Sequence, residues 1–583
     1  MSPFGPVNPI ARWGESVRSQ PIATLLTVAL IVLLAGGLLW PIGMAIYQAF
    51  VHRGSLSGYW FSRLLHDRTG AQLLNGLQLA SLATGISLLL AVPLALVRAR
   101  CRFVGQKVLG VAVLVPLILP PFVGAMSMRQ LLGQFGVLNL ILERLGLLEI
   151  GPGELPPDWL AGGMVGVAVI QALHLFPILY LNASASLANV DPSHTQAARN
   201  LGAGPARTFL RVTLPLIRPG LFAGGTIVFI WSFTDIGTPL IMSYTDLLPV
   251  RIFQELSSTY GGKTFAMVFV LLAISVGLYV LGKFVFGRSE DVAGSKATLQ
   301  AETRTLGPLA TVGAWALFGL VLVAAILPHV GVVLTALADS WINTIVPTRY
   351  TTAHLQAVVT SEETYRSILN SLKYAGTSTV IDLGIGTLAA WLIVRSRSAG
   401  SGLLDALAML PLAVPGLILA AGYVAMTVPG SLLDRMGITP VDNPFVLLVI
   451  AYSVRRLPFV VRGVSAGLQQ VPVSLEEAAR NLGSSRAGAA RRITLPLVTA
   501  NLIAAGVLTF SFAMLEVSDS LVLAQRASDY PITKQIYILY TSGTAASANV
   551  AAALGVYGMG LLATTMAVAS ILLGRKLGAI FRA

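Results

Sequence analysis

The sequence predicts an all-α polytopic membrane protein with about 12 transmembrane helices in two parallel six-helix repeats. Three observations support this fold class. First, 55% of the 583 residues are hydrophobic and 11% are charged, and the mean hydropathy is +0.77. Second, apolar runs of about 20 residues recur, and a helix of that length crosses the roughly 30 Å hydrocarbon core of a bilayer. Third, the second half of the chain repeats motifs of the first.

The first apolar run extends from Ile22 to about Phe50 and follows Arg12 and Arg18. Because the apolar core of a signal peptide has only about 7–15 residues, we interpret this run as an uncleaved first span. The predicted spans of the first half lie near residues 22–48, 72–97, 107–126, 160–184, 220–242 and 265–287, and those of the second half near 307–336, 366–394, 404–427, 444–468, 498–524 and 550–574.

The loops predict the orientation of these spans. If both termini are cytoplasmic, the loops on that side are rich in Lys and Arg and the opposite loops are poorer, as the positive-inside rule requires. This bias explains the net charge of +14 better than nucleic-acid binding does. The cytoplasmic cations would be Arg98, Arg100, Arg102, Lys107, Arg199, Arg207, Arg211, Arg218, Lys283, Arg288, Arg395, Arg397, Arg480, Arg486, Arg491, Arg492, Arg575 and Lys576. We expect a multi-pass protein of the bacterial inner (plasma) membrane.

Sites for chemistry are scarce in this sequence. The single cysteine, Cys101, excludes an intrachain disulfide and a cysteine-cluster metal site. The segment "GGKT" at Gly261–Thr264 is similar to a phosphate-binding loop, but Ser257 occupies the place of the required first glycine. We therefore expect no catalytic residues, no metal site and no cofactor in this chain.

Matched residues define the internal repeat. Pro177, Gly202 and Pro215 recur 281 positions later, as Pro458, Gly483 and Pro496. Upstream the offset is 295, as between Asn75 and Asn370. The first half therefore has about 14 extra residues, which we place in the external stretch before its fourth span. Six spans per half bring both halves into the membrane the same way round, as in parallel repeats.

The most polar repeated segment lies between the fourth and fifth spans of each half. It reads "QAARNLGAGPARTFLRVTLPL" from Gln196 and "EEAARNLGSSRAGAARRITLPL" from Glu476. Ser193 with Gln196, and Ser474 with Glu477, have the spacing of a capping box at a helix start.

Each copy also carries signals for the end of this helix and the start of the next. Gly202 and Gly483 stand where a helix C-terminus favours a left-handed residue. Thr213 and Thr494 then read as N-caps that start the fifth span of each half. The pattern predicts a short helix, a sharp turn and a second helix at the cytoplasmic surface. Its small alanines suit close approach by another protein, and the alternative is an interfacial helix that only stabilises the loop.

The second copy fits the pattern E-A-A-x3-G-x9-I-x-L-P at every position, and the first departs from it at Gln196 and Val212. It resembles the EAA loop of the permeases of binding-protein-dependent (type I) ABC importers, where this loop is the coupling helix that inserts into the cytoplasmic ATPase. The resemblance implies coupling roles for Gln196, Ala197, Ala198, Gly202, Pro215, Glu477, Ala478, Ala479, Gly483 and Pro496.

This resemblance implies partners and an organisation for the chain. The partners would be two copies of a cytoplasmic ABC ATPase subunit, a periplasmic substrate-binding protein and the lipid bilayer, with ATP hydrolysis on the separate subunit. The two fused halves resemble the ferric-iron permeases, and also the thiamine and aminoalkylphosphonate permeases. The expected divisions are an N-terminal segment with the first helix (1–70), a first permease domain (71–288), a cytoplasmic linker (289–306), a leading helix with an external loop (307–364) and a second permease domain (365–577).

Polar residues within the predicted spans are candidates for a solute pathway or gate, because burying charge in lipid is costly. They are His174, Asp235, Arg455, Arg456, Glu516 and Asp519. The repeat aligns His174 with Arg455 and Asp235 with Glu516, and Asp519 would share a helix face with Glu516. These residues either line a central pathway or form ion pairs that lock helices together. Helix register places Arg455 near the bilayer midplane with Glu516 somewhat nearer the periplasm, and we expect this pair to close the resting pathway.

Two classes of transporter fit these features. An importer permease explains the twin loops, whereas a secondary transporter driven by an ion gradient has twelve spans but no need of such loops. A membrane scaffold without transport leaves the buried charges unexplained. Segments such as "DIGTP" and "YPITKQIY" resemble ferric-iron permeases most, while Arg455 and Arg456 suit an anion or an anion-chelated metal better than a bare cation.

Overall fold

The computed structural model describes residues 20–573, apart from 152, 161–162, 259, 287–303 and 397. Within that part the fold is helical, and the strands form three short two-stranded pairs. Nine helices there are long and apolar enough to cross a membrane, or up to eleven if each of two bent pairs is one span. A further helix, α22 (Phe445–Gln470), is 26 residues long but carries three arginines, Arg455, Arg456 and Arg462. The predicted all-α polytopic fold is confirmed.

The first half contains these helices and strands. Its long elements are α2 (Pro21–Leu34), the π-helical turn η1 (Ala35–Leu39), α3 (Trp40–Phe50), α5 (Thr69–Arg100), α6 (Gln106–Ala112), the 3-10 turn η2 (Val115–Ile118), α7 (Pro121–Leu132), α9 (Met164–Ala188), α11 (Pro205–Thr208), the π-helical turn η3 (Phe209–Thr213), α12 (Leu214–Thr234) and α15 (Gly262–Phe286). Its connections contain β1 (Val51–His52), β2 (Ser55–Leu56), α4 (Tyr59–Leu65), β3 (Cys101–Arg102), α8 (Val137–Arg144), α10 (Pro192–Asn200), α13 (Gly237–Ile241) and α14 (Leu248–Leu256).

The second half repeats this order. Its long elements are α16 (Pro308–Leu337), α18 (Glu362–Trp391), the π-helical turn η5 (Leu392–Ser396), α19 (Ser401–Met409), the 3-10 turn η6 (Leu410–Leu412), α20 (Gly416–Met426), α22, α24 (Arg486–Ala489), the π-helical turn η7 (Ala490–Thr494), α25 (Leu495–Met514) and α28 (Ala545–Leu573). Its connections contain β4 (Arg304–Thr305), β5 (Ala338–Ser340), β6 (Arg349–Tyr350), α17 (Ala353–Thr360), α21 (Leu432–Arg435), α23 (Val473–Asn481), α26 (Ser518–Leu523), the 3-10 turn η8 (Ala527–Asp529) and α27 (Ile532–Thr541).

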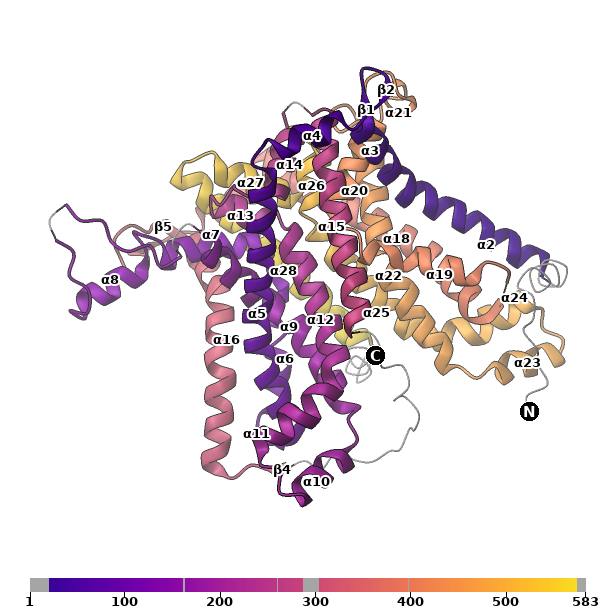
Figure 1. Cartoon of the computed structure of the whole chain (residues 1–583), viewed down its shortest axis with the longest axis horizontal. Coiled ribbons are helices and arrows are strands. Elements are labelled where there is room, and N and C mark those ends of the chain that lie inside the picture. Colours follow the sequence, from indigo (N-terminus) through magenta and orange to yellow (C-terminus); the bar gives the residue numbers. More distant parts are fainter. Residues whose placement is uncertain are drawn as a thin grey trace.

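The leading helix of each half packs against the other half. Figure 1 shows α16 beside the helices of the first half, and α2 beside α19 of the second. The Tyr423 hydroxyl of α20 donates to the Gly37 carbonyl at 2.7 Å, and the Ser127 hydroxyl of α7 donates to the Pro328 carbonyl of α16 at 2.7 Å. These buried interhelical hydrogen bonds interlock the two halves.

The third span of each half is bent rather than straight. The spans predicted near 107–126 and 404–427 are each a pair of helices, which meet at 94° in the first half and at 103° in the second. Pro120 and Pro415 stand at these breaks, as the N-cap residues of α7 and α20. Proline lacks the backbone N–H that a continuing helix needs.

The fifth span of each half is also broken. The spans predicted near 220–242 and 498–524 are present but end earlier than expected, because α12 ends at Thr234 and α25 ends at Met514. The short helices α13 and α26 follow each break. The two breaks approach one another, since a Cβ added to Gly237 would lie 3.3 Å from Val517 Cγ1.

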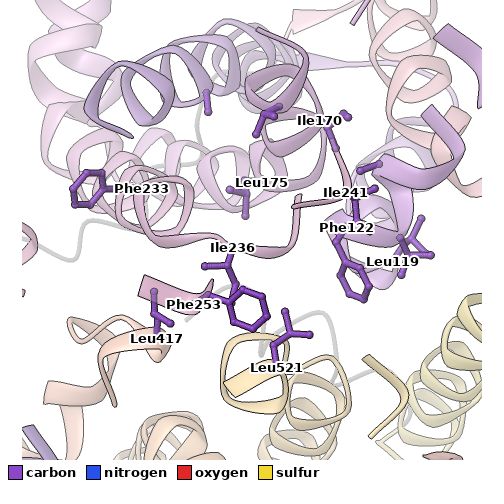
Figure 2. Packing of buried hydrophobic residues seen from close by; sticks show 14 of the residues in the cluster. Leu119, Phe122, Ile170, Leu175, Phe233, Ile236, Ile241, Phe253, Leu417 and Leu521 are labelled. Atoms are coloured by element: carbon purple, nitrogen blue, oxygen red, sulfur yellow. The ribbon is translucent and has the colours of Figure 1, made fainter. Parts of the chain in front are cut away.

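Apolar side chains seal the contact between the halves at this level. Figure 2 shows Ile236 and Phe253 of the first half facing Leu417 and Leu521 of the second. All four are buried in one continuous cluster. The predicted linker lies largely outside the described residues, and its end at Arg304–Thr305 pairs with Cys101–Arg102 as β4 with β3.

Candidate functional site

The repeated polar segments fold as α10 and α23, each ending in a left-handed glycine. Gly202 has φ +80° and Gly483 has φ +91°. The N–H of Gly202 donates to Arg199 O at 2.8 Å and that of Ala203 to Ala198 O at 3.0 Å. The second copy repeats both bonds, from Gly483 to Arg480 O and from Ser484 to Ala479 O, each at 3.0 Å. This Schellman geometry confirms the predicted sharp turns.

The predicted capping boxes are wrong. Asp191 caps α10 by accepting from the N–H of Ser193 at 2.8 Å, and these bonds lower the pKa of its carboxyl. Pro472 precedes α23, which has no side-chain cap, so Ser474 lies inside the helix. In both loops a proline near the first turn moves the helix start to a position before the serine.

The predicted N-caps at Thr213 and Thr494 are also wrong. Helix continues from α11 through η3 into α12, and from α24 through η7 into α25. Pro215 and Pro496 therefore lie inside a helical segment, directly after a π-helical turn. A π-turn widens the helix locally, which relieves the clash between a proline ring and the preceding turn.

The two surface helices expose the same apolar position. Leu201 is 88% exposed and Leu482 is 89% exposed, and the repeat aligns them. The small residues of the motif line this face, since Ala197 and Ala478 are exposed and Ala198 and Ala479 are half-buried. Figure 1 places α10 and α23 at the lower end of the view, away from α4 and α21. Each half thus presents an apolar tip on a short, fixed helix.

Each loop is tied to its half by an arginine, in two different ways. Arg395, in η5, donates to Leu468 O at 2.9 Å and to Val471 O at 2.6 Å, and its Nε lies 3.2 Å from Glu476 Oε1. The Thr494 hydroxyl donates to the same Glu476 oxygen at 2.7 Å. The second loop is therefore held by a partly buried carboxylate bridge.

The first loop lacks that carboxylate. Arg100, the repeat equivalent of Arg395, donates to the Thr213 hydroxyl directly. Thr195 stands where the second loop has Glu476, and its hydroxyl donates to Pro192 O at 2.8 Å. The two loops have the same shape but are anchored by different bonds.

Four of the predicted pathway residues form one buried cluster. Arg455 NH1 lies 2.5 Å from Glu516 Oε1 and 3.2 Å from Asp519 Oδ2. Arg456 pairs with the other oxygen of Glu516, and its guanidinium carbon lies 5.6 Å from the centre of the Phe512 ring. Glu516 is 4% exposed and Asp519 is completely buried. Two cations and two carboxylates thus face one another, with both carboxylates buried and the Arg455 and Arg456 side chains 19% and 12% exposed.

The break in the fifth span of the second half shapes this cluster. Glu516 lies in the break and Asp519 in α26, so the predicted shared helix face is wrong. The Glu516 side chain turns toward α26, with Oε1 3.5 Å from the N–H of Asp519. Its backbone carbonyl accepts from Ser520 at 2.6 Å and from Thr533 at 2.7 Å.

The first half has a different, less charged arrangement at this level. Asp235 accepts from the N–H groups of Gly237 and Thr238 and from Gln171 Nε2, the last at 3.0 Å. His174 does not join it, because its Nδ1 bonds to Pro116 O at 2.9 Å. The structure therefore brings together the four residues of the second half and keeps His174 apart from Asp235.

Sequence reasoning missed several residues that hold these sites. Gln171 has no charge, and its repeat partner is Tyr452, so neither composition nor repeat marked it. Gly416 makes room for Arg455, since a Cβ there would lie 2.1 Å from Arg455 NH1. The sequence analysis named Arg395 only as one of the loop cations. The offset of 295 aligns it with Arg100, and this repeated arginine could have identified it as an anchor of the loop.

The remaining candidates have structural explanations. Within the described residues, no group of three or more His, Cys, Asp or Glu side chains is placed to hold a metal ion. In "GGKT", Gly262 starts α15 and Lys263 Nζ lies 2.7 Å from Asp67 Oδ2. This lysine belongs to an ion-pair group with Arg251, whose NH2 lies 2.5 Å from the same oxygen.

Comparison with known proteins adds a family match. The model of the family "binding-protein-dependent transport system inner membrane component" matches residues 87–290 and again residues 382–580.

Curated relatives are similar over much of the chain. A putative ferric transport system permease protein FbpB 1 of Haemophilus influenzae is 26% identical over 72% of this chain and 64% of its own length. The ferric transport system permease protein FbpB of Actinobacillus pleuropneumoniae is 26% identical over 72% of this chain and 59% of its own length. A putative 2-aminoethylphosphonate transport system permease protein PhnU of Salmonella typhimurium is 29% identical over 47% of this chain and 95% of its own length. The match thus spans less than two thirds of the length of the two ferric relatives.

Proposed function

The chain belongs to the family of binding-protein-dependent transport system inner membrane components, and from this premise we propose that it is the transmembrane permease subunit of an ATP-driven ABC importer. It would pass a solute from a periplasmic binding protein to the cytoplasm. The observation that carries this proposal is the pair of matched surface helices, α10 and α23, each with an exposed leucine beside a left-handed glycine. Two docking helices in one chain suit an ATPase with two equivalent subunits.

We propose the partners of the chain from the same two helices. A cytoplasmic ABC ATPase subunit would bind in two copies, one on Leu201 with α10 and one on Leu482 with α23. ATP hydrolysis would belong to those subunits, and this chain would not be an enzyme. We propose that both termini and both loops lie in the cytoplasm, and that the permease domains span 71–288 and 365–577.

We propose iron(III) as the transported solute. The support is the similarity to two ferric permeases over 72% of this chain. Phosphonate, thiamine or a similar solute is the alternative, and similarity to a 2-aminoethylphosphonate permease covers 47% of the chain. The cluster itself favours neither an anionic nor a cationic solute, because the charges of Glu516 and Asp519 balance those of Arg455 and Arg456.

The buried cluster is the proposed gate. Its position beside the contact between Gly237 and Val517 puts it where the two halves meet. All four residues belong to the second half, and we propose that opening moves the break between α25 and α26 relative to α22 and so rearranges the pairs of Glu516 with the two arginines. Breaking a buried pair without a replacement costs on the order of 3–5 kcal/mol, which suits a barrier that ATP binding overcomes. His174 and Asp235 would line the same pathway from the first half.

Co-purification with the ATPase tests the docking proposal. A Leu201→Asp, Leu482→Asp double variant places charge on both apolar tips, which are exposed and make no core contact. It should reach the membrane at the normal level but lose the ATPase subunit on purification. A double variant at exposed positions away from the loops, Leu65→Asp with Leu56→Asp, is the control. Normal ATPase retention by the first variant would overturn the docking proposal.

A further inference from the structure

Asp382 of α18 lies at the level of the charge cluster but outside it. Asp382 is 1% exposed, and neither of its carboxylate oxygens has a hydrogen-bond partner in the described part of the chain. Nearby Ser453 instead donates to the Ser378 carbonyl at 3.3 Å. One turn after Asp382, Gly386 packs closely against α22, since a Cβ added to this glycine would lie 2.7 Å from Val460 Cγ1. These two contacts bracket Asp382 on α18 and Arg456 on α22, so the two residues lie at the same height.

Arg456 is also incompletely paired. Its NH2 group pairs with Glu516, whereas its Nε is buried without a hydrogen-bond partner among the described residues. A buried carboxylate without a partner is costly, and so is a buried donor. An unused acceptor and an unused donor therefore lie at the same height on two helices, α18 and α22, that pack against each other.

We propose that Asp382 is a positioning residue for transport: it is the second carboxylate partner of Arg456, which leaves Glu516 for Asp382 when the break between α25 and α26 moves away from α22. This inference rests on the proposed function. Arg455 would keep its contact with Asp519, so each buried guanidinium has a carboxylate in both states. Exchange between two carboxylates keeps both guanidinium groups paired and gives the gate two discrete arrangements.

The same helix connects this exchange to a coupling loop. α18 runs into η5, where Arg395 binds Glu476 at the start of α23. Asp382 and Arg395 are 13 residues apart in sequence, or roughly 20 Å along a helix. A displacement of α23 would therefore move the helix that carries Asp382.

The first half has no equivalent of this switch. The repeat places Ser87 at the position of Asp382 and Leu175 at that of Arg456, and both are buried. The exchange is therefore a single device in the second half, on the side whose loop has the carboxylate bridge to Arg395.

The first test uses Asp382→Asn, which keeps the size and removes the charge. In the complex with its ATPase, this variant should assemble normally, with a Tm equal to or above that of the wild type, because the resting state loses only an unpaired carboxylate. ATP-driven uptake should fall at least tenfold. Thr379→Val, one turn earlier on α18 and also buried with an unpaired hydroxyl, is the matched control and should transport within twofold of wild type. Wild-type uptake by Asp382→Asn, or a Tm loss that accounts for its defect, would overturn the proposal.

The second test measures ATPase activity without binding protein. Glu516→Gln should raise this activity several-fold, because Arg456 then favours Asp382. Adding Asp382→Asn should return it to the wild-type level, whereas a merely structural role predicts a further defect. If Glu516→Gln raises the activity and Asp382→Asn leaves it raised, the exchange is wrong and the importer assignment stands. If no ATPase subunit assembles with the wild-type chain, the proposed function itself fails.

Discussion

At the scale of single residues, the charge cluster depends on one glycine. Gly416 starts α20, and any Cβ there would meet Arg455 NH1. The absence of a side chain lets Arg455 extend between Glu516 and Asp519 across the contact of α20 with α26. The cluster is therefore a fitted arrangement of charges and small residues, in which the placement of each charge depends on its neighbours.

Exchanging the charges of the main pair tests whether it acts as a gate. Glu516→Gln alone leaves two arginines with a single carboxylate, and we expect raised ATPase activity without binding protein. Glu516→Arg combined with Arg455→Glu restores one pair, so it should bring coupling partly back. ATPase activity and uptake of the reconstituted complex are the measurements. If Glu516→Arg and Arg455→Glu each transport normally, or if the double variant is no better than the worse of these two, the charges do not form a gate.

Asp67 predicts a pH dependence of stability outside the spans. Hydrogen bonds from Arg251 and Lys263 lower the pKa of its carboxyl below the ordinary aspartate value. A lowered folded pKa adds stability above the unfolded pKa, and that stability is lost as pH falls through the folded value. Because the group is partly exposed, Asp67→Asn should cost about 1 kcal/mol at pH 7.

The check is the Tm of both proteins in detergent across acidic pH. The difference between wild type and Asp67→Asn should shrink as pH falls below the ordinary aspartate range. Glu362→Gln, which removes the exposed pair with Arg366, should leave Tm unchanged. A Tm difference between wild type and Asp67→Asn that grows toward low pH would contradict the lowered pKa of Asp67.

At the scale of elements, the turns of the coupling loops were predictable and their starts were not. A glycine directly after a short amphipathic segment, repeated 281 residues later, indicates a left-handed helix end, and the structure has it at Gly202 and Gly483. The helix starts were predicted wrongly, because Pro192 and Pro472 place them before the serines of the expected capping boxes. Apolar runs likewise gave the length of the spans but not the breaks at Asp235 and Glu516.

A valine at the left-handed glycine tests the coupling turn. Gly202→Val forces an unfavourable backbone at about 1–2 kcal/mol, although no atom lies within 4 Å of the added Cβ. Gly204→Val is the matched control, since Gly204 has the same open space and an extended backbone with φ −66° and ψ 167°. The first variant should lose co-purified ATPase and uptake while the second keeps both. Equal behaviour of the two would show that the turn is dispensable.

At the scale of the whole molecule, the halves are interlocked repeats that differ in charge. Sequence offsets predicted two parallel sets of six spans, and the architecture agrees. The offsets could not predict that α2 and α16 each pack against the opposite half, because neither offsets nor apolar periodicity show which helices pack together. Nor could they predict that Asp382 of α18 lies level with Arg456 of α22, because the offsets do not say which helices of one half pack together.

The topology of the assembled chain can be checked with introduced cysteines. In a Cys101→Ser background, Val104→Cys probes the connection after α5 and Leu432→Cys probes α21, and both positions are well exposed. A membrane-impermeant maleimide should label only position 432 in spheroplasts and only position 104 in inside-out vesicles. The reverse pattern would place the coupling loops on the wrong side for an ATPase.

The most direct measurement of the central claim is uptake by proteoliposomes that contain this chain with the ATPase that co-purifies with it. Radiolabelled iron(III) is presented outside on the binding protein, and ATP is enclosed. An importer permease predicts uptake that requires both ATP and the binding protein, and that persists when proton and sodium gradients are collapsed. Uptake that proceeds without ATP and stops when a gradient is collapsed would contradict the account and identify a secondary transporter.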